Sequence, residues 1–274
     1  MTTNPKSLLD RHALQPKKSL GQNFLHDPNT LEKIAASADL TPEDTVLEIG
    51  PGTGALTDVL ARMAGRVIAI ELDGRLEPIL RERFADRPNV RVVFGDILET
   101  DVAAVVGPEP YSVVANVPYY ITSAILRHLL EAAHRPQRIV MTIQLEVAER
   151  LVAKPNDMSL LAVSAQFYAH PRIVSRLPAS VFWPRPDVDS AVVRLDLYPQ
   201  PPVDVPDEAT FFRVVRAGFS QKRKQIKNAL ATGLALPMAE TVTFVEAAGI
   251  DPKRRAETLT LDEWAGLARA YAGR

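Results

Sequence analysis

Short apolar runs alternate with helical patterns over the first half of the chain, and this alternation limits the fold more than any other feature. The runs predict strands at residues 45–49, 66–70, 90–94, 111–115 and 138–143. Helical patterns lie between or after them, at residues 55–63, 121–130 and 145–152. A further helical pattern follows the second strand and ends near residue 84. Strands that alternate with helices form a parallel sheet covered by helices on both faces. The sequence therefore predicts an α/β fold.

The second half of the chain adds two strand candidates and then changes character. Residues 159–168 and 190–197 are apolar stretches, and the second alternates, as an antiparallel strand would. We therefore expect a mostly parallel sheet of seven strands. Residues 199–206 are proline-rich and predict a linker, after which only helical patterns follow. This organisation predicts a sheet-containing domain of residues 1–200 and a small all-helical domain of residues 201–274.

The composition excludes several classes of protein. The chain has no cysteine, so disulfides and thiolate metal sites are impossible, and no metal site is expected. Residues 1–20 are polar and contain no apolar core, so they do not resemble a secretory signal. No stretch is apolar for long enough to span a membrane. We therefore expect a soluble, cytoplasmic protein that does not bind membranes.

Basic charge is concentrated in one part of the predicted helical domain. The formal net charge of −1 argues against a uniformly basic nucleic-acid binder, but residues 209–239 contain no acidic residue. Within that stretch lie Lys222, Arg223, Lys224 and Lys227. A solvated helix face is the simpler interpretation of such a cluster. The lack of interleaved acids favours a surface that binds the phosphates of a nucleic acid.

A glycine turn follows the first predicted strand and predicts a nucleotide-containing cofactor. Gly50, Gly52 and Gly54 allow a ligand to approach the backbone at the start of a helix. Glu71 ends the second strand, where it could bind ribose hydroxyls, and Asp96 follows the third, where it could bind an adenine amino group. These features alone do not separate a nicotinamide dinucleotide from S-adenosylmethionine.

The motif Asn116-Val117-Pro118-Tyr119 after the fourth strand favours S-adenosylmethionine. The exocyclic amine of a base is a poor nucleophile, because its lone pair is delocalised into the ring. An amide oxygen and a backbone carbonyl held rigid by proline could accept its two N–H bonds and favour a pyramidal nitrogen in the transition state. Tyr119 would offer a face to the unstacked base. An ordinary strand-ending turn remains the alternative interpretation.

Taken in order, the motifs resemble those of the ribosomal RNA adenine N6-dimethyltransferases, most closely the bacterial 16S branch of that family. The resemblance spans nearly the whole chain and implies a Rossmann-like class I methyltransferase fold. Besides the glycine turn, Glu71, Asp96 and the Asn-Val-Pro-Tyr motif, it rests on residues 17–27, 181–193, 219–228 and 255–257.

The resemblance also implies roles for single residues. Asn23, Leu25, Gly50, Gly52, Glu71 and Asp96 would contact S-adenosylmethionine, and Asn116 would contact both the target amine and the transferred methyl group. Tyr119 and Phe182 would stack on the two faces of a flipped adenine. His26 and the other histidines are not placed to act as a general base, and none is needed, because the methylated amine can lose its proton to water.

By the same resemblance, the substrate would be two adjacent adenosines in the 3′-terminal hairpin of 16S rRNA, dimethylated by a monomer acting on the immature small subunit. Lys222, Arg223, Lys224 and Lys227 would bind RNA phosphates. Two alternatives stay open at this point. One is a 23S rRNA adenine methylase that confers macrolide resistance, and the other is a non-catalytic nucleic-acid-binding factor in ribosome assembly or transcription.

Overall fold

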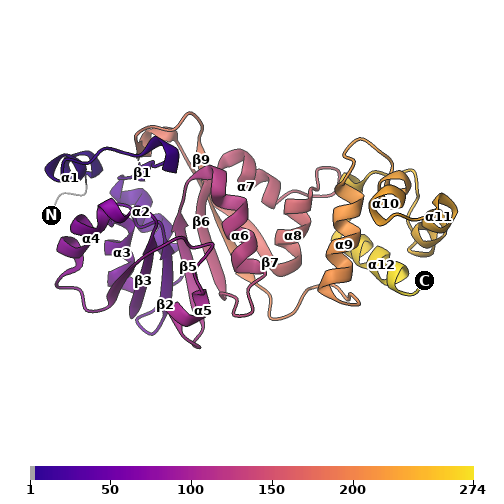
Figure 1. The fold of residues 1–274 in the computed structure, drawn as a ribbon, viewed down its shortest axis with the longest axis horizontal. Helices are drawn as coiled ribbons and strands as arrows, with labels where there is room; N and C mark the ends of the chain where they lie inside the picture. Colours follow the sequence, from indigo (N-terminus) through magenta and orange to yellow (C-terminus); the bar gives the residue numbers. More distant parts are fainter. Residues whose placement is uncertain (1–3) are drawn as a thin grey trace. The chain divides into compact units, whose positions relative to one another are not determined.

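The computed structural model describes residues 4–274, and Figure 1 shows how their helices and strands are arranged. Residues 1–3 lie outside the described part. They are the first residues of the predicted domain 1–200 and of the segment 1–20, which is not expected to be a secretory signal. The chain forms two compact units. The first unit consists of the chain up to Ala148 together with Pro171–Leu197, and the second consists of Glu149–His170 and Tyr198–Arg274.

A mostly parallel sheet of seven strands is the centre of the first unit, as the sequence predicted. The strand order is β4-β3-β2-β5-β6-β9-β7. The bounds are β2 Thr45–Ile49, β3 Arg66–Glu71, β4 Val90–Phe94, β5 Tyr111–Asn116, β6 Arg138–Gln144, β7 Ala169–Leu177 and β9 Ser190–Leu197. Strands β4, β3, β2, β5 and β6 pair in parallel, whereas β9 pairs with β6 antiparallel. Because the chain order reverses between β2 and β5, ligands are expected at the carboxyl ends of these strands.

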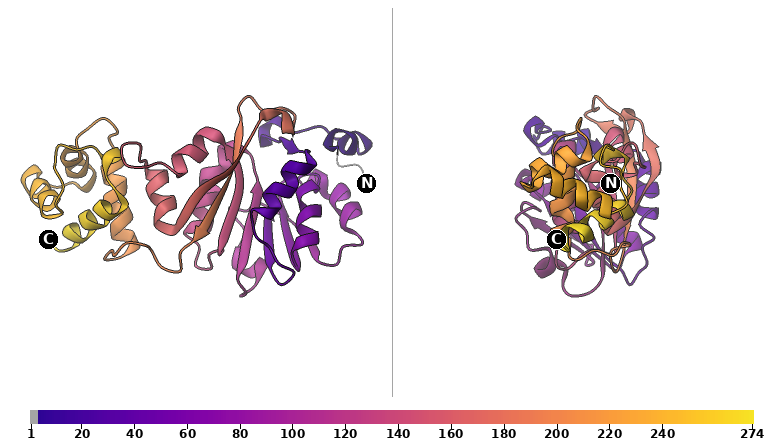
Figure 2. Two further views of the ribbon diagram at one scale, coloured as in Figure 1. Left: turned by 180° about the vertical axis from the view of Figure 1, so that it is seen from behind. Right: turned by 90° about the vertical axis from the view of Figure 1, so that its right-hand side faces the viewer.

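Helices of the first unit cover the sheet on both faces, as the two ribbon views show (Figures 1 and 2). They are α2 Pro28–Ala36, α3 Ala55–Met63, α4 Glu77–Phe84, α5 Val102–Val106 and α6 Thr122–Leu130. Helix α1 Pro5–Arg11 packs through Leu9 against α4, and α7 Leu145–Leu151 begins in this unit and ends in the second. Buried side chains of α2 and α3, such as Ile34 and Leu60, pack against Val46 and Val114 of the central strands. Each of these helices therefore turns one apolar stripe towards the sheet.

Residues 4–274 also contain five short 3₁₀ helices. They are η1 Lys18–Leu20, η2 Gly74–Leu76, η3 Tyr119–Ile121, η4 Ala179–Val181 and η5 Ala256–Thr258. A separate ribbon of two strands, β1 Phe24–Leu25 and β8 Phe182–Trp183, joins the N-terminal segment to the segment before β9. Leu25 pairs with Phe182, so two residues that the sequence assigned to a single site are direct neighbours.

One predicted strand is wrong. Residues 159–168 form a helix, α8 Leu160–Tyr168, and the Ser159 hydroxyl caps it by accepting the N–H of Ala162 at 3.2 Å. The helix is apolar on most of its surface, and periodicity cannot distinguish such a helix from a buried strand. The seventh strand is the next segment, β7, whose polar residues alternate at the edge of the sheet.

The second unit is helical. Besides α8 it contains α9 Glu208–Phe219, α10 Ile226–Leu234, α11 Met238–Ala247 and α12 Leu261–Ala272. Phe167 of α8 stacks on Phe211 of α9 with ring centroids 4.5 Å apart, and Trp264 of α12 is fully buried. Because α8 belongs to this unit, the chain passes between the two units three times. The boundaries are at 148/149, at 170/171 and at 197/198, just before the predicted linker. That residues 1–200 and 201–274 act as separate domains stays a prediction.

Three of the four basic residues of the cluster do not lie on a helix face. Lys222, Arg223 and Lys224 precede α10 in an exposed loop after α9. No helix among residues 4–274 is long and apolar enough to cross a membrane.

Candidate active site

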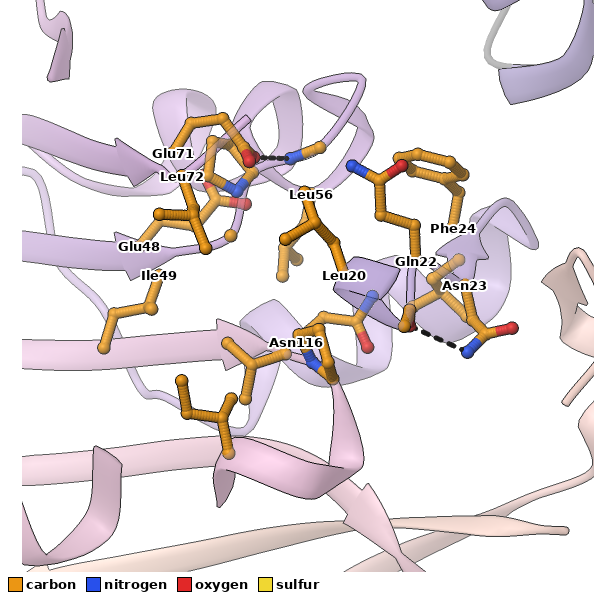
Figure 3. A pocket seen from close by; sticks show the side chains of 18 of the residues that line it. Leu20, Gln22, Asn23, Phe24, Glu48, Ile49, Leu56, Glu71, Leu72 and Asn116 are labelled. Atoms are coloured by element: carbon orange, nitrogen blue, oxygen red, sulfur yellow. Dashed lines mark hydrogen bonds between the residues drawn. The ribbon is translucent and has the colours of Figure 1, made fainter. Parts of the chain in front are cut away.

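A pocket of about 1110 Å³, partly open to solvent, lies at the carboxyl ends of β2, β3, β4 and β5. Its lining includes every residue that the sequence assigned to the cofactor or the target base: Asn23, Leu25, Gly50, Gly52, Glu71, Asp96, Asn116, Tyr119 and Phe182. Figure 3 shows Glu48, Glu71 and Asn116 at the ends of their strands, with Gln22, Asn23 and Phe24 of the N-terminal segment on the other side of the pocket.

The glycine turn between β2 and α3 has the backbone geometry that its sequence predicted. Gly50, Gly52 and Gly54 all have positive φ angles, of 73°, 59° and 81°. A β-carbon on Gly52 would lie 2.9 Å from the ring of Phe24, and one on Gly54 would lie 2.8 Å from the ring of Phe84. The turn therefore needs glycine both for its backbone and for the close contacts of its neighbours.

Glu71, the last residue of β3, is held by two backbone donors. Its carboxylate accepts the N–H of Gly52 at 2.9 Å and the N–H of Asp73 at 2.8 Å, so one side chain fixes both the glycine turn and the loop after β3 (Figure 3). Burial raises the pKa of Glu71, and the backbone donors oppose that rise. The carboxylate lines the pocket.

Glu48 is the residue of this pocket that the sequence analysis did not single out. Its side chain is only 1% exposed, and neither carboxylate oxygen has a hydrogen-bond partner among the described residues. Burial raises the pKa of Glu48 to about 8, and the charges of Glu71 and Asp58 add to the rise. The Thr57 hydroxyl opposes it without reaching hydrogen-bonding geometry. An acid at the end of a strand, two residues before the first glycine of the turn, was the available signal.

Asp96 lies where the sequence predicted it, just after β4 and on the wall of the pocket. Its Oδ1 accepts the N–H of Leu98 at 2.9 Å. This bond fixes both the turn and the orientation of the carboxylate. The Thr100 hydroxyl donates to the backbone carbonyl of Asp96 at 2.7 Å. Both bonds hold the acid at the strand end, in a position suited to the amino group of an adenine.

The N-terminal segment forms a roof over the pocket. Gln22 ties it down, because its amide donates to Asp73 at 2.9 Å while its carbonyl accepts the N–H of Lys17 at 2.7 Å. Asn23 donates to the carbonyl of Gly21 at 3.1 Å, which orients its side chain along the roof. Leu25 is 4% exposed and contributes an apolar wall. A β-carbon on Gly21 would lie 3.1 Å from Pro118, so the roof approaches the Asn-Val-Pro-Tyr motif closely.

Asn116 ends β5, and its motif turns away from the sheet at the edge of the pocket. The backbone carbonyl of Asn116 lies 3.3 Å from the position that a β-carbon on Gly50 would take, so the motif and the glycine turn are in contact. Tyr119 opens η3, and its hydroxyl is 2.7 Å from the Oγ of Ser190. Phe182 lines the same pocket at 4% exposure and also packs into the apolar cluster of α2 and α3.

The charge of the lining distinguishes between the two cofactors that the glycine turn allowed. Its ionisable side chains are the acids Glu48, Glu71 and Asp96, together with tyrosines, and no lysine, arginine or histidine among the described residues lines it. The described part of the lining offers no basic side chain as a counter-charge for the pyrophosphate of a dinucleotide beside the glycine turn. It suits a ligand that carries the positive charges of a sulfonium and an ammonium group. The residues present therefore fit S-adenosylmethionine.

The predicted RNA-binding residues lie in the second unit. Lys222, Arg223 and Lys224 are exposed, whereas Lys227 is half-buried in the first turn of α10. Backbone bonds from Ile226 to Arg254 (2.6 Å) and from Lys227 to Pro252 (3.3 Å) place the loop 251–255 beside them. That loop exposes Lys253 and Arg255 near the cluster, together with Asp251, and Arg255 pairs with Glu257 at 3.8 Å.

No group of three or more histidine, aspartate or glutamate side chains within residues 4–274 is arranged to hold a metal ion.

Known proteins resemble the chain over nearly its whole length. The family model described as "Ribosomal RNA adenine dimethylase" matches residues 13–272. Proteins named "Ribosomal RNA small subunit methyltransferase A" are similar over almost the whole chain. The one from Dehalococcoides mccartyi (strain CBDB1) is 46% identical over 98% of this chain and 92% of its own length. The one from Moorella thermoacetica is 47% identical over 96% and 95%.

Two solved structures have a similar fold over about nine tenths of this chain. The 23S rRNA methyltransferase ErmE has a TM-score of 0.74 and 31% identity, covering 90% of this chain and 99% of its own. A dimethyladenosine transferase from Plasmodium falciparum has a TM-score of 0.76 and 25% identity, covering 91% and 98%. The chain therefore belongs to the ribosomal RNA adenine dimethylase family and is an S-adenosylmethionine-dependent rRNA adenine dimethyltransferase.

Proposed function

We propose that this enzyme dimethylates the N6 amines of two adjacent adenosines in the 3′-terminal hairpin of 16S rRNA, acting as a cytoplasmic monomer on the immature small subunit. The observation that carries the proposal is the Asn116–Tyr119 motif at the end of β5, in one pocket with the glycine turn and Glu71. The relatives support the choice of subunit. Those named for the small subunit are 42–47% identical, whereas the 23S enzyme is 31% identical.

In this proposal the acidic side of the pocket binds S-adenosylmethionine, which supplies an electrophilic methyl group when bound. Glu71 binds the ribose hydroxyls, Asp96 the adenine amine, and Gly50 and Gly52 the methionine portion. Glu48 balances the positive charge there. The roof residues Asn23 and Leu25 exclude water and hold the reacting groups in line, which accounts for much of the rate.

The target adenine enters from the side of Asn116 after it is extruded from its helix, which costs a few kcal/mol. Tyr119 and Phe182 stack on its faces, at about 1–3 kcal/mol per stacked base. The amide oxygen of Asn116 and a backbone carbonyl of the motif accept the N–H bonds of the amine, so that its lone pair points at the methyl group. The amine then loses its proton to water. The pocket must also accept the monomethylated amine for the second transfer.

Binding of the RNA backbone falls to Lys222, Arg223, Lys224 and Lys227 of the second unit, since phosphate contacts position a nucleic acid without reading its sequence. Residues Lys253 and Arg255 extend the same surface. This assignment separates the groups that hold the RNA from the groups that carry out the transfer.

Tritiated methyl transfer to immature small subunits, large subunits and naked rRNA tests the substrate. The proposal expects label in the small subunit alone, confined to the 3′-terminal hairpin. Label in 23S rRNA would assign the enzyme to the branch that confers macrolide resistance. Binding to small subunits without any transfer would favour a non-catalytic assembly or transcription factor.

A further inference from the structure

The hydroxyl of Tyr119 is hydrogen-bonded to a buried residue, Ser190. The Tyr119 ring lines the pocket, and its hydroxyl is 2.7 Å from the Oγ of Ser190, with either atom able to donate. Ser190 is the first residue of β9, is fully buried, and pairs with Gln144 of β6. Burial raises the pKa of Tyr119, and the nearby charge of Asp189 adds to the rise, so the phenol is neutral at physiological pH.

The residue before Ser190 fixes the segment that carries the second aromatic ring. The Oδ1 of Asp189 accepts the N–H of Ala179 at 2.9 Å, at the start of η4, and η4 leads directly into Phe182. The backbone carbonyl of Asp189 accepts the N–H of Leu145 at 3.1 Å, which ties the same residue to the end of β6. Two consecutive residues therefore hold the elements that carry Tyr119 and Phe182.

We propose that Ser190 is a positioning residue for methyl transfer, which fixes the place of the Tyr119 ring in the pocket so that the target adenine is held between Tyr119 and Phe182. This inference rests on the proposed stacking role of the two rings. A tyrosine tethered only at its α-carbon can swing about its first side-chain torsion, which carries the whole ring. A bond to a rigid strand removes that freedom before the base arrives, and small errors in the position of reacting groups lower rates strongly.

A double-mutant cycle with Ser190→Ala and Tyr119→Phe tests the proposal, because each variant removes one partner of the hydrogen bond and keeps the ring. We expect each to lower kcat about tenfold, as loss of one buried hydrogen bond implies. The double variant should lose no more than either single variant. The dissociation constant for S-adenosylmethionine and the affinity for rRNA should stay within about twofold of wild type.

Ser112→Ala is the matched control, since Ser112 is an equally buried serine on β5 of the same sheet. Its kcat should match wild type, and its melting temperature should match that of Ser190→Ala. Three results would overturn the proposal. The first is a wild-type kcat in Ser190→Ala, and the second is a loss in the double variant equal to the product of the two single losses. The third is a loss in Ser190→Ala that Tyr119→Phe does not share. The last would give Ser190 a purely structural role at the start of β9.

The failure of the proposed function would look different. The cycle is measured on whichever rRNA the wild-type enzyme methylates, so a different substrate RNA would contradict the proposed target and leave the comparison of variants intact. Tyr119→Ala isolates the stacking role. If it methylates as fast as wild type, the ring does not hold the base, and the positioning role of Ser190 is wrong.

Discussion

Single acidic residues give the pocket its chemical character. Glu71 uses both oxygens on backbone donors, so it shapes the glycine turn and also faces the ligand. Glu48 has no partner at all in the described part of the chain, which is an expensive arrangement for a buried carboxyl. A ligand with a positive charge in the pocket would relieve that cost. The stability of the free enzyme is therefore expected to depend on the protonation of Glu48.

The pH dependence of unfolding tests this expectation for Glu48. Its pKa is about 8 in the folded chain against an ordinary value of 4.5, so the folded state binds the proton more tightly than the unfolded state. The free energy of unfolding should fall as the pH rises from about 4.5 to about 8, and then become level. Glu48→Gln should lack this component. Urea unfolding at pH 5 and pH 8 measures the difference between wild type and variant. An equal difference at both pH values would contradict the assignment.

At the scale of elements, the glycine turn, the roof and the end of β5 fit together through contacts that leave no room for side-chain atoms. Gly52 lies under Phe24, Gly21 lies against Pro118, and Gly50 lies against the carbonyl of Asn116. The geometry of the pocket is therefore set by three segments that are distant in the sequence.

Gly52→Ala is expected to weaken binding of S-adenosylmethionine by about tenfold or more. Alanine at a φ of 59° costs about 1–2 kcal/mol, and its β-carbon would push Phe24 and the roof outward. Isothermal titration calorimetry of the cofactor gives the affinity. Gly74→Ala is the control, because no heavy atom lies within 4 Å of its β-carbon position. Equal affinities in the two variants would show that the roof does not depend on this contact.

Helices α3 and α4 are joined under the glycine turn by an ion pair between Asp58 and Arg83. The Nε of Arg83 donates to Asp58 at 2.8 Å, its Nη1 donates to the carbonyl of Thr53 at 3.0 Å, and its side chain is 4% exposed. Arg83→Met should lower the free energy of unfolding by about 3 kcal/mol, since it leaves a partly buried acid and a carbonyl without their donor. The exposed pair Arg81–Glu77 serves for comparison, and Arg81→Met should cost under about 1 kcal/mol. Urea unfolding of both variants measures the two values, and similar losses would refute the structural role of Arg83.

Most elements of the first unit could be predicted, because each strand ends at a motif or turn that marks its boundary. The strands from β2 to β6 and the antiparallel β9 were predicted within about a residue. Residues 159–168 were assigned wrongly because an all-apolar helix has no period that separates it from a strand. The pairing of Leu25 with Phe182 and the bond from Ser190 to Tyr119 arise only when segments about 70 to 160 residues apart meet, and no local pattern reports such contacts.

In the proposed function, the work of the whole molecule is divided between the two units. The described residues of the first unit contain the acidic pocket and the Asn116–Tyr119 motif, whereas the second contains the basic cluster. The near-neutral net charge thus conceals two surfaces of opposite sign. If the division is correct, RNA binding and cofactor binding can be removed separately.

Replacement of Lys222, Arg223 and Lys224 by glutamine should weaken rRNA binding and leave cofactor binding unchanged. Each lost phosphate contact should reduce the slope of log affinity against log salt by about 0.7–0.9. Filter binding at several salt concentrations gives the slope, and calorimetry gives the cofactor affinity. The control replaces Lys6, Arg11 and Lys33 by glutamine, since all three are exposed on α1 and α2 of the first unit. An unchanged slope in the first variant would mean that the RNA is bound elsewhere.

The most direct test of the account compares wild-type enzyme with Asn116→Ala on immature small subunits, with the modified nucleosides mapped by mass spectrometry. The account predicts N6,N6-dimethyladenosine at two adjacent positions for wild type. For Asn116→Ala it predicts a rate at least about a hundredfold lower, because an interaction made in the transition state is lost, with the affinity for rRNA retained. Dimethyladenosine formed by Asn116→Ala at the wild-type rate would contradict the central role given to the motif at the end of β5.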